Sequence, residues 1–337
     1  MFKITRTKLL FNFLMLFVLA LGFYACQQED TFSPQEEEKQ ISLFDQHLED
    51  NTQTIQAQDL GNGQYVVTGE QGTRIEIDNA LVNATGERVR GDIDIVLIEI
   101  YSQADMILNR KQTLADYNGQ NVVLESGGEI FIQVYQNGEE LSADGNGEMN
   151  IFLPTENTGG AKEGMELFYG EEVGDQVIWK PTGVAIKVVN TDIRNGGEYL
   201  AIIQNTLGWI NVDIIYGEQG EEVECVEVRI DCDQFCEIPG TGTATVALHL
   251  SSANSAFELQ LDPTTGTYLL CGEGGQAIPI GGLQVTFIVV IECPEGGLAY
   301  VALVTVTINI GYHLEVITCS QFQQMDPAMF QQALLNL

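Results

Sequence analysis

Apolar and polar residues alternate with a period of two over much of the chain after about residue 60. Arg74–Asp78 alternates cleanly, and 129–136 and 149–153 each place their apolar residues on one face. This pattern predicts half-buried β-strands, whose side chains point alternately to opposite faces. The run 92–100 changes phase midway, which predicts a bulge or a strand buried on both faces. Turn dipeptides separate the runs: Asn137-Gly138, Asp144-Gly145, Gly159-Gly160 and Asn195-Gly196. Residues 61–222 therefore predict one N-terminal antiparallel β domain.

A second β domain is predicted for residues 223–320, where six of the seven cysteines gather. Seven candidate strands lie near 224–231, 243–250, 256–261, 267–271, 282–293, 298–310 and 312–319. Seven short strands in about 100 residues are typical of an immunoglobulin-like sandwich. The chain has no tryptophan beyond Trp209, so the Cys-Trp-Cys core signature is missing and only the general sandwich architecture is predicted.

Two short helices are expected. Ser102 can cap a helix over 102–108, and Asp326-Pro327 supplies a cap and a first-turn proline for a C-terminal helix within 321–337. That last helix presents Phe330, Leu334 and Leu335. The predicted fold class is thus all-β, with two antiparallel β-sandwich-like domains and a short C-terminal helix.

The N-terminus has the composition of an export signal. Residues 1–25 combine a basic start with an apolar stretch over 9–24, and 16 residues are fewer than the roughly 20 needed to cross a bilayer. The end of this segment, Phe23-Tyr24-Ala25-Cys26, resembles a bacterial lipobox, which implies lipidation of Cys26 and anchoring in a membrane. Phe23 departs from the usual leucine, and a rival cleavage after Gly22 would release a soluble protein.

The residues after Cys26 are polar and acidic. Residues 26–60 predict a disordered tether with one short helix near 42–48. Its first residues, Gln27-Gln28-Glu29-Asp30, resemble the acidic signal that sends Bacteroidota lipoproteins to the outer face of the outer membrane.

The charge of the chain excludes some partners. The formal net charge is −34, and without residues 1–25 the remaining 11 basic and 48 acidic residues give −37 over 312 residues. So large a negative excess argues against nucleic acid as a partner and against binding an anionic membrane through a basic face.

Cysteines are the first candidates for chemistry. In an exported protein they tend to pair, and six of them allow fifteen connectivities that the sequence cannot distinguish. A metal site is the alternative, but their spacing lacks the short CxxC pairs of structural zinc sites. Disulfides are therefore favoured for Cys225, Cys232, Cys236, Cys271, Cys293 and Cys319.

Other candidate site residues are few. His47, His249 and His313 are interpreted as surface histidines, and no nucleophile motif accompanies them, so we expect no catalytic residues and no cofactor. The alternation of Asp144, Asn146 and Glu148 is like the start of a calcium loop but lacks its later ligands, and a hairpin turn is favoured there.

The two tryptophans are weighed as ring platforms for a sugar or as core residues. Trp179 and Trp209 are both embedded in apolar strands, which favours core packing.

Four stretches carry a resemblance: GTRIEIDNAL at 72–81, IEIYSQADM at 98–106, LESGGEI at 124–130 and LGWIN at 207–211. Over about 65–215 the chain resembles a group of Bacteroidota surface lipoproteins of unassigned function, and it is distantly similar to ZU5-type β domains. The resemblance implies a protein-interaction module and no enzyme activity, and it assigns no catalytic residues.

Three functions are weighed on this basis. The first is a non-enzymatic, lipid-anchored protein at the cell surface that binds a protein partner or shapes the outer membrane. The second is a glycan-binding module in polysaccharide capture, which exposed, coplanar aromatic rings would favour. The third is an exported hydrolase, which requires a concave pocket with two carboxylates, or with one carboxylate and a histidine.

The charge predicts how salt affects stability. We expect the melting temperature to rise with ionic strength and further with millimolar Ca²⁺ or Mg²⁺, because diffuse screening relieves repulsion among the carboxylates. Thermal melts titrated with each ion at fixed ionic strength measure this, and screening should treat the two ions alike. A sharp, calcium-selective rise that Asp144→Ala abolishes would contradict it.

Overall fold

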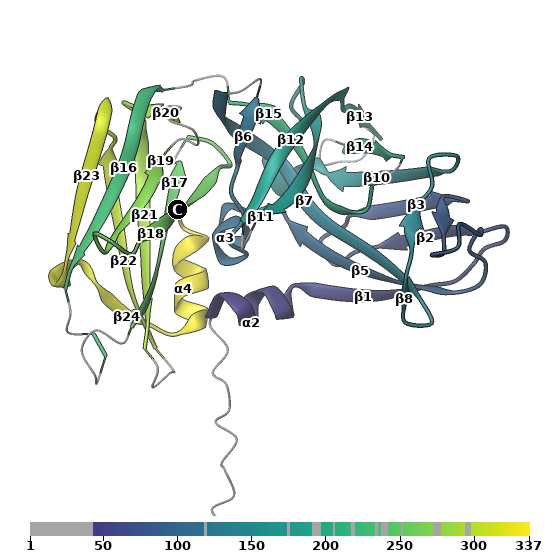
Figure 1. Ribbon diagram of the computed structural model, residues 1–337, viewed down its shortest axis with the longest axis horizontal. Coiled ribbons are helices and arrows are strands. Elements are labelled where there is room, and N and C mark those ends of the chain that lie inside the picture. Colours follow the sequence, from purple (N-terminus) through teal and green to yellow (C-terminus); the bar gives the residue numbers. More distant parts are fainter. Residues whose placement is uncertain are drawn as a thin grey trace, which may run out of the picture. The chain divides into compact units, whose positions relative to one another are not determined.

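The computed structural model describes residues 43–117, 120–173, 176–190, 197–204, 206–216, 220–232, 235–236, 242–250, 252–271, 278–293 and 298–337. They belong to one compact unit, 41–337. The predicted signal peptide 1–25 and Cys26 lie outside the described residues. Within the described part the predicted all-β class is confirmed (Figure 1).

Sheet A has eight strands, and its order is β1-β5-β7-β15-β11-β12-β6, with β8 added to β7. Their bounds are β1 (Thr52–Ala57), β5 (Ile93–Ile100), β6 (Leu114–Tyr117), β7 (Gln120–Gln136), β8 (Glu139–Glu140), β11 (Glu166–Val173), β12 (Gln176–Ala185) and β15 (Gly208–Ile215). Because β6 also pairs with β7, five of these strands close into a ring.

Sheet B covers one face of sheet A and is built from five strands in the order β13-β14-β10-β3-β2. These are β2 (Gln64–Thr68), β3 (Arg74–Asp78), β10 (Glu148–Pro154), β13 (Lys187–Val189) and β14 (Glu198–Ile203), and a short pair, β4 (Leu81–Val82) with β9 (Ser142–Ala143), extends the arrangement. The alternating apolar residues of β3 and β10 fill the core between the two sheets, together with Leu97 and Ile130 of sheet A.

The change of phase predicted in 92–100 comes from burial on both faces of β5. Ile95 and Leu97 face the core against sheet B, whereas Ile98 and Ile100 belong to a different buried cluster on the opposite face. The pairing of β5 with β1 and β7 runs without a shift in register, so no bulge is involved.

The C-terminal region forms a nine-stranded sheet that folds into two layers. Its order is β20-β16-β19-β18-β17-β21-β22-β24, with β23 added to β16. The bounds are β16 (Glu221–Asp231), β17 (Thr243–Leu250), β18 (Ala256–Asp262), β19 (Thr267–Cys271), β20 (Ile278–Gly281), β21 (Gln284–Glu292), β22 (Ala299–Thr307), β23 (Gly311–Thr318) and β24 (Gln323–Met325). All seven predicted strands are present. The first half of β18 pairs with β17 and its second half with β19, so this strand joins the layers around a shared core.

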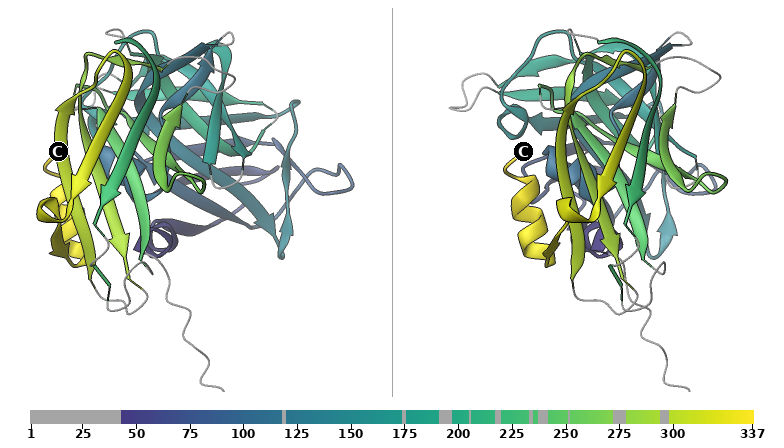
Figure 2. Two further views of the ribbon diagram at one scale, coloured as in Figure 1. Left: turned by 60° about the vertical axis from the view of Figure 1, so that its left-hand side comes forward. Right: turned by 90° about the vertical axis from the view of Figure 1, so that its left-hand side faces the viewer.

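Three helices, α2 (Leu43–Asp50), α3 (Gln103–Leu108) and α4 (Pro327–Leu334), contribute to a third buried cluster between sheet A and the outer face of β17, β21 and β22 (Figures 1 and 2). Ser102 caps α3 with Asp105, and Asp326 caps α4, as predicted. Phe330 and Leu334 are buried as expected, whereas Leu335 is exposed. Two 3₁₀ turns, Thr155–Thr158 and Cys319–Gln321, complete the helical elements described. No helix in the described ranges has the length and apolarity needed to span a membrane.

The short helix predicted near 42–48 is present as α2, but the prediction of a disordered tether over 26–60 is wrong from Leu43 onward. Phe44 is only 4% exposed and packs edge-on against Phe330, with ring centroids 6.4 Å apart. Residues 52–57 pair along their whole length with β5. The segment has few apolar residues, but these pack against apolar side chains of other elements. Its backbone hydrogen bonds with β5 add β1 as the edge strand of sheet A.

Three disulfides connect the six cysteines, as predicted: Cys225–Cys271, Cys232–Cys319 and Cys236–Cys293. The first joins directly opposed residues of β16 and β19. The second closes the parallel pair β16 and β23 just beyond its last paired residues, Asp231 and Thr318. Because all six cysteines are paired in these bonds, the alternative that they bind a metal does not hold.

Removing one bond tests its contribution. Changing both Cys232 and Cys319 to serine should lower the free energy of unfolding by about 2–5 kcal/mol, because the unfolded chain regains the freedom of a long loop. Denaturant unfolding measures the loss. As a control, unfolding of the two proteins in excess reductant should converge, and equal midpoints without reductant would contradict the prediction.

Candidate functional site: a buried acid cluster beside helix α3

Four polar side chains meet on the face of sheet A that is turned toward the helices. We call Ser126, Glu129, Asn211 and Asp213 the acid cluster; each is at most 1% exposed. Glu129 lies opposite Asn211, and Ser126 lies opposite Asp213, on the paired strands β7 and β15. Ile130 faces the core against sheet B, so Glu129 faces the other way.

A local irregularity of the backbone places the cluster. The pairing of β7 and β15 shifts register between Asn211 and Asp213, next to two glycines. A Cβ on Gly127 would lie 2.8 Å from the carbonyl oxygen of Val212, and Gly128 has a φ of +131°. Side chains larger than hydrogen are therefore excluded at both positions.

Hydrogen bonds connect three members of the cluster. The Ser126 hydroxyl donates to Asn211 Oδ1 over 3.2 Å, and Asn211 Nδ2 donates to Asp213 Oδ2 over 2.6 Å. Both carboxylate oxygens of Glu129 and Oδ1 of Asp213 have no hydrogen-bond partner among the described residues. Buried carboxylates without donors are strongly disfavoured in the charged form.

Burial raises the pKa of Glu129 well above its usual value, and the neighbouring Asp213 charge raises it further, against the opposing effect of Lys111. Burial likewise raises the pKa of Asp213, although the neighbouring Ser126 hydroxyl and the hydrogen bond from Asn211 act in the other direction. Two adjacent carboxylates in a dry site cannot both be ionised cheaply. The cluster therefore holds a proton that exposed acids would have lost.

Lys111 is the cation of this region. Burial lowers its pKa, although Glu129, Glu172 and Glu258 each act to raise it. Its Nζ lies 4.4 Å from the centroid of the Trp209 ring, whose Nε1 donates to Glu172 Oε1 over 2.8 Å. The ring face gives the ammonium group an electrostatic partner where water is scarce.

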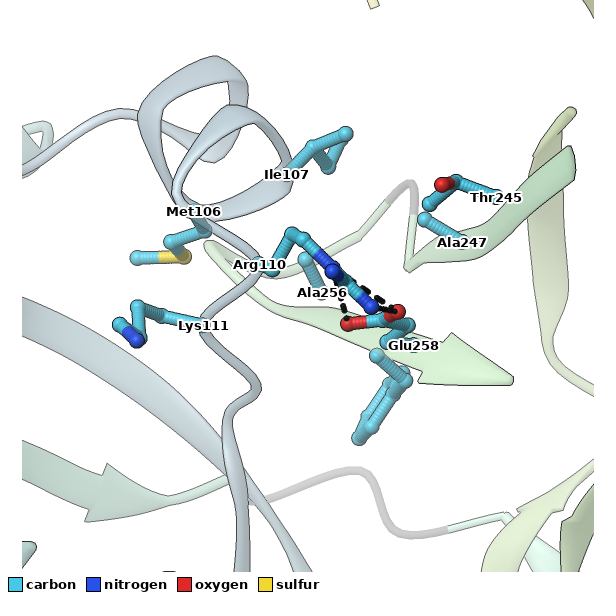
Figure 3. Close-up of a pocket in the computed structure, with 9 residues that line it drawn as sticks. Met106, Ile107, Arg110, Lys111, Thr245, Ala247, Ala256 and Glu258 are labelled. Carbon is cyan, nitrogen blue, oxygen red and sulfur yellow. Dashed lines mark hydrogen bonds and ion pairs between the residues drawn. The ribbon is translucent and has the colours of Figure 1, made fainter. Parts of the chain in front are cut away.

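A small pocket lies beside this cluster, between α3 and the strands β17 and β18 (Figure 3). Arg110 reaches across it to Glu258, and its Nε lies 3.0 and 3.1 Å from the two carboxylate oxygens. Lys111 points away from Glu258, toward the side of Met106. The cavity volume is about 10 Å³, which is room for one water molecule. The pocket is therefore filled by an ion pair that joins two parts of the fold. A hydrolase would need two carboxylates there, or one carboxylate and a histidine, and Glu258 is the one carboxylate among the described residues that line this pocket.

The prediction of surface histidines is wrong for His249 and His313, which are 1% and 4% exposed. His249 lies on the outer face of β17, which the helices and sheet A cover, and burial lowers its pKa to about 4. On β23 the alternation is the reverse of that expected: His313 points inward and stacks on Phe287, while its neighbours Tyr312 and Leu314 face solvent. His47 is half-buried, 3.9 Å from Asp105.

The structure does not assemble Asp144, Asn146 and Glu148 into a calcium site. Asp144 is paired with Arg88 and accepts hydrogen bonds from Asn146, whereas Glu148 accepts one from Asn150. In the described ranges no group of three acidic, histidine or cysteine side chains could hold a metal. The turn at 144–147 is not the simple hairpin that was favoured. β9, before the turn, pairs with β4, and β10, after it, pairs with β3, so the turn is a bulge within one continuous pair of strands.

Core packing is confirmed for both tryptophans, since Trp179 is fully buried and Trp209 is 6% exposed. The Nε1 of Trp179 donates to the carbonyl oxygen of Gln112 over 2.6 Å. Neither ring can therefore serve as a platform for a sugar.

Sequence reasoning missed the acid cluster and Lys111. A signal was present: Glu129 stands between Gly127-Gly128 and the apolar run Ile130–Ile132, and Asn211 and Asp213 interrupt an apolar strand. Polar residues on one face of a strand are normally taken as solvated, and only the packing of a third layer shows that this face is buried.

Comparisons with known proteins assign this chain to no family: neither a scan against family models nor a search of curated proteins found a match.

The raised pKa values make stability dependent on pH. Unfolded Glu129 and Asp213 ionise near 4.5 and 3.8, whereas the folded protein retains a proton, so stability is lost as pH rises above these values toward the folded pKa. Glu129→Gln removes one ionisable group without changing the shape. Its free energy of unfolding, relative to the unaltered protein, should increase from pH 5 to pH 8.

Denaturant unfolding at several pH values measures that difference. Glu140→Gln, on the exposed β8, serves as a matched control and should leave the pH dependence unchanged. A Glu129→Gln profile parallel to that of the unaltered protein would show that Glu129 is ionised in the fold.

Proposed function

We propose that this chain is a non-enzymatic surface lipoprotein, anchored in the outer membrane through Cys26, and that its β region acts as an interaction or structural module. The three disulfides carry the proposal, because such bonds form and persist in exported proteins and are rare in a reducing cytosol. The export signal predicted for residues 1–25 agrees with this compartment.

The geometry of the described region supports a module that binds through its surface. The acid cluster is closed to solvent, and the pocket beside it has room for one water molecule. Binding energy must then come from exposed strands and loops, as in other β-sandwich interaction domains. Burial of both tryptophans counts strongly against the glycan-binding alternative.

The anchor is tested by changing Cys26 to alanine. We expect the unaltered protein in the membrane fraction and accessible to protease added to intact cells, and the variant in the soluble fraction, because the thiol that would carry the lipid is gone. Ser33→Ala, in the same acidic segment, is the matched control and should stay in the membrane fraction. A Cys26→Ala protein that remains membrane-bound would contradict the anchor.

A further inference from the structure

β23 is an edge strand with an open side. It pairs in parallel with β16 over its eight residues, and no other strand in the described ranges pairs with it (Figure 1). In a parallel pair about half of the backbone N–H and C=O groups point away from the partner. Along β23 these groups are available to a further strand.

The edge strands β24, β13 and β1 are short or polar by comparison. β24 and β13 have three residues each, and β24 packs beside α4. β1 presents threonine and glutamine side chains. β23 and the residue before it instead expose Ile310, Tyr312 and Leu314, at 66%, 49% and 41%. The strand also lacks the lysines and prolines that commonly protect an edge from pairing.

Contacts at both ends hold β23 in its extended form. At its start, the ring of His313 stacks on Phe287 and its Nδ1 accepts a hydrogen bond from the Asn309 backbone over 3.0 Å. At its end, the disulfide between Cys232 and Cys319 ties the strand to β16. A partner strand would meet an edge that is already ordered, which lowers the entropy cost of binding.

The charge around this edge selects the partner. Arg229 is the one basic residue of β16 and β23 apart from His313, whose pKa burial lowers. Six carboxylates accompany it on these two strands: Glu221, Glu222, Glu224, Glu227, Asp231 and Glu315. A second copy of this acidic chain would be repelled, whereas a basic segment would be attracted.

We propose that β23 is a docking edge for an extended segment of a partner protein in which basic and apolar side chains alternate. The segment adds a strand to the sheet through backbone hydrogen bonds, and its apolar side chains cover Tyr312 and Leu314 on the outer face. Its basic side chains point to the opposite face, where Glu315 of β23 lies, and the negative charge of the two strands attracts them. This inference rests on the proposed function, because it gives the interaction module its binding surface.

The test uses the full chain and a synthetic peptide of about ten alternating lysine and valine residues. We expect saturable binding in fluorescence anisotropy. The same peptide with an N-methyl group on every residue keeps its charge but has no backbone N–H to donate to an edge. Its affinity should fall at least about tenfold, because the backbone hydrogen bonds are lost.

A matched pair of variants locates the binding edge. Leu314→Lys removes an apolar contact and repels the basic peptide, so affinity should fall at least about tenfold. Ile202→Lys makes the same change at a residue of similar exposure, 42%, on the distant strand β14 and should bind as the unaltered protein does. Thermal melts confirm that both variants fold, and the methylated peptide tests the proposal on the unaltered chain.

Several results would overturn the proposal. Equal binding of the methylated peptide would mean that charge alone attracts it, and equal losses in the two variants would place binding elsewhere. A dimer that Leu314→Lys dissociates would make a second copy the occupant. Absence of peptide binding, with Cys26→Ala still releasing the protein from the membrane, would reject the docking edge and leave the anchor standing.

Discussion

The central strands of sheet A lose contact with water on both faces, and the arrangement of the other layers depends on this. Sheet B covers one face, and the helices with β17, β21 and β22 cover the other. A strand in the middle layer must then be apolar at successive positions, as β5 is from Leu97 to Ile98, or must compensate each polar side chain that it buries. Both arrangements occur next to each other at the end of β5, where the apolar pair Leu97 and Ile98 is followed by the buried, hydrogen-bonded Glu99.

Glu99 and Glu129 are buried acids on opposite faces of neighbouring strands. The carboxylate of Glu99 accepts hydrogen bonds from the backbone of Gln71 and Thr73 and from the side chain of Gln53, which fastens the turn between β2 and β3 to sheet A. Glu129 has no such donors, and it is accommodated by keeping its proton. One acid thus connects two sheets through hydrogen bonds, whereas the other makes the opposite face sensitive to pH.

Local sequence patterns were sufficient to locate many of the strands. Period two located β3, β10 and the C-terminal strands, and capping residues located α3 and α4, because these signals act within a few residues. The assignment of buried faces failed where a third layer is involved. His249 alternates with apolar residues as a solvated residue would, and Phe44 lies in a segment too polar to fold alone. Their burial depends on surfaces contributed by residues far away in sequence, which no local window contains.

The disulfide between Cys232 and Cys319 has a mechanical consequence. Tension that enters the chain from its N-terminal side reaches Cys232 at the end of β16 and can pass through the sulfur atoms directly to β23 and the residues after it. The chain between the two cysteines spans a sequence separation of 87 residues, which is about 300 Å when fully extended. The disulfide prevents this part of the chain from extending under tension. With the proposed anchor on its N-terminal side and the proposed partner on β23, the protein would transmit force across this region without unfolding the core that the C-terminal strands share.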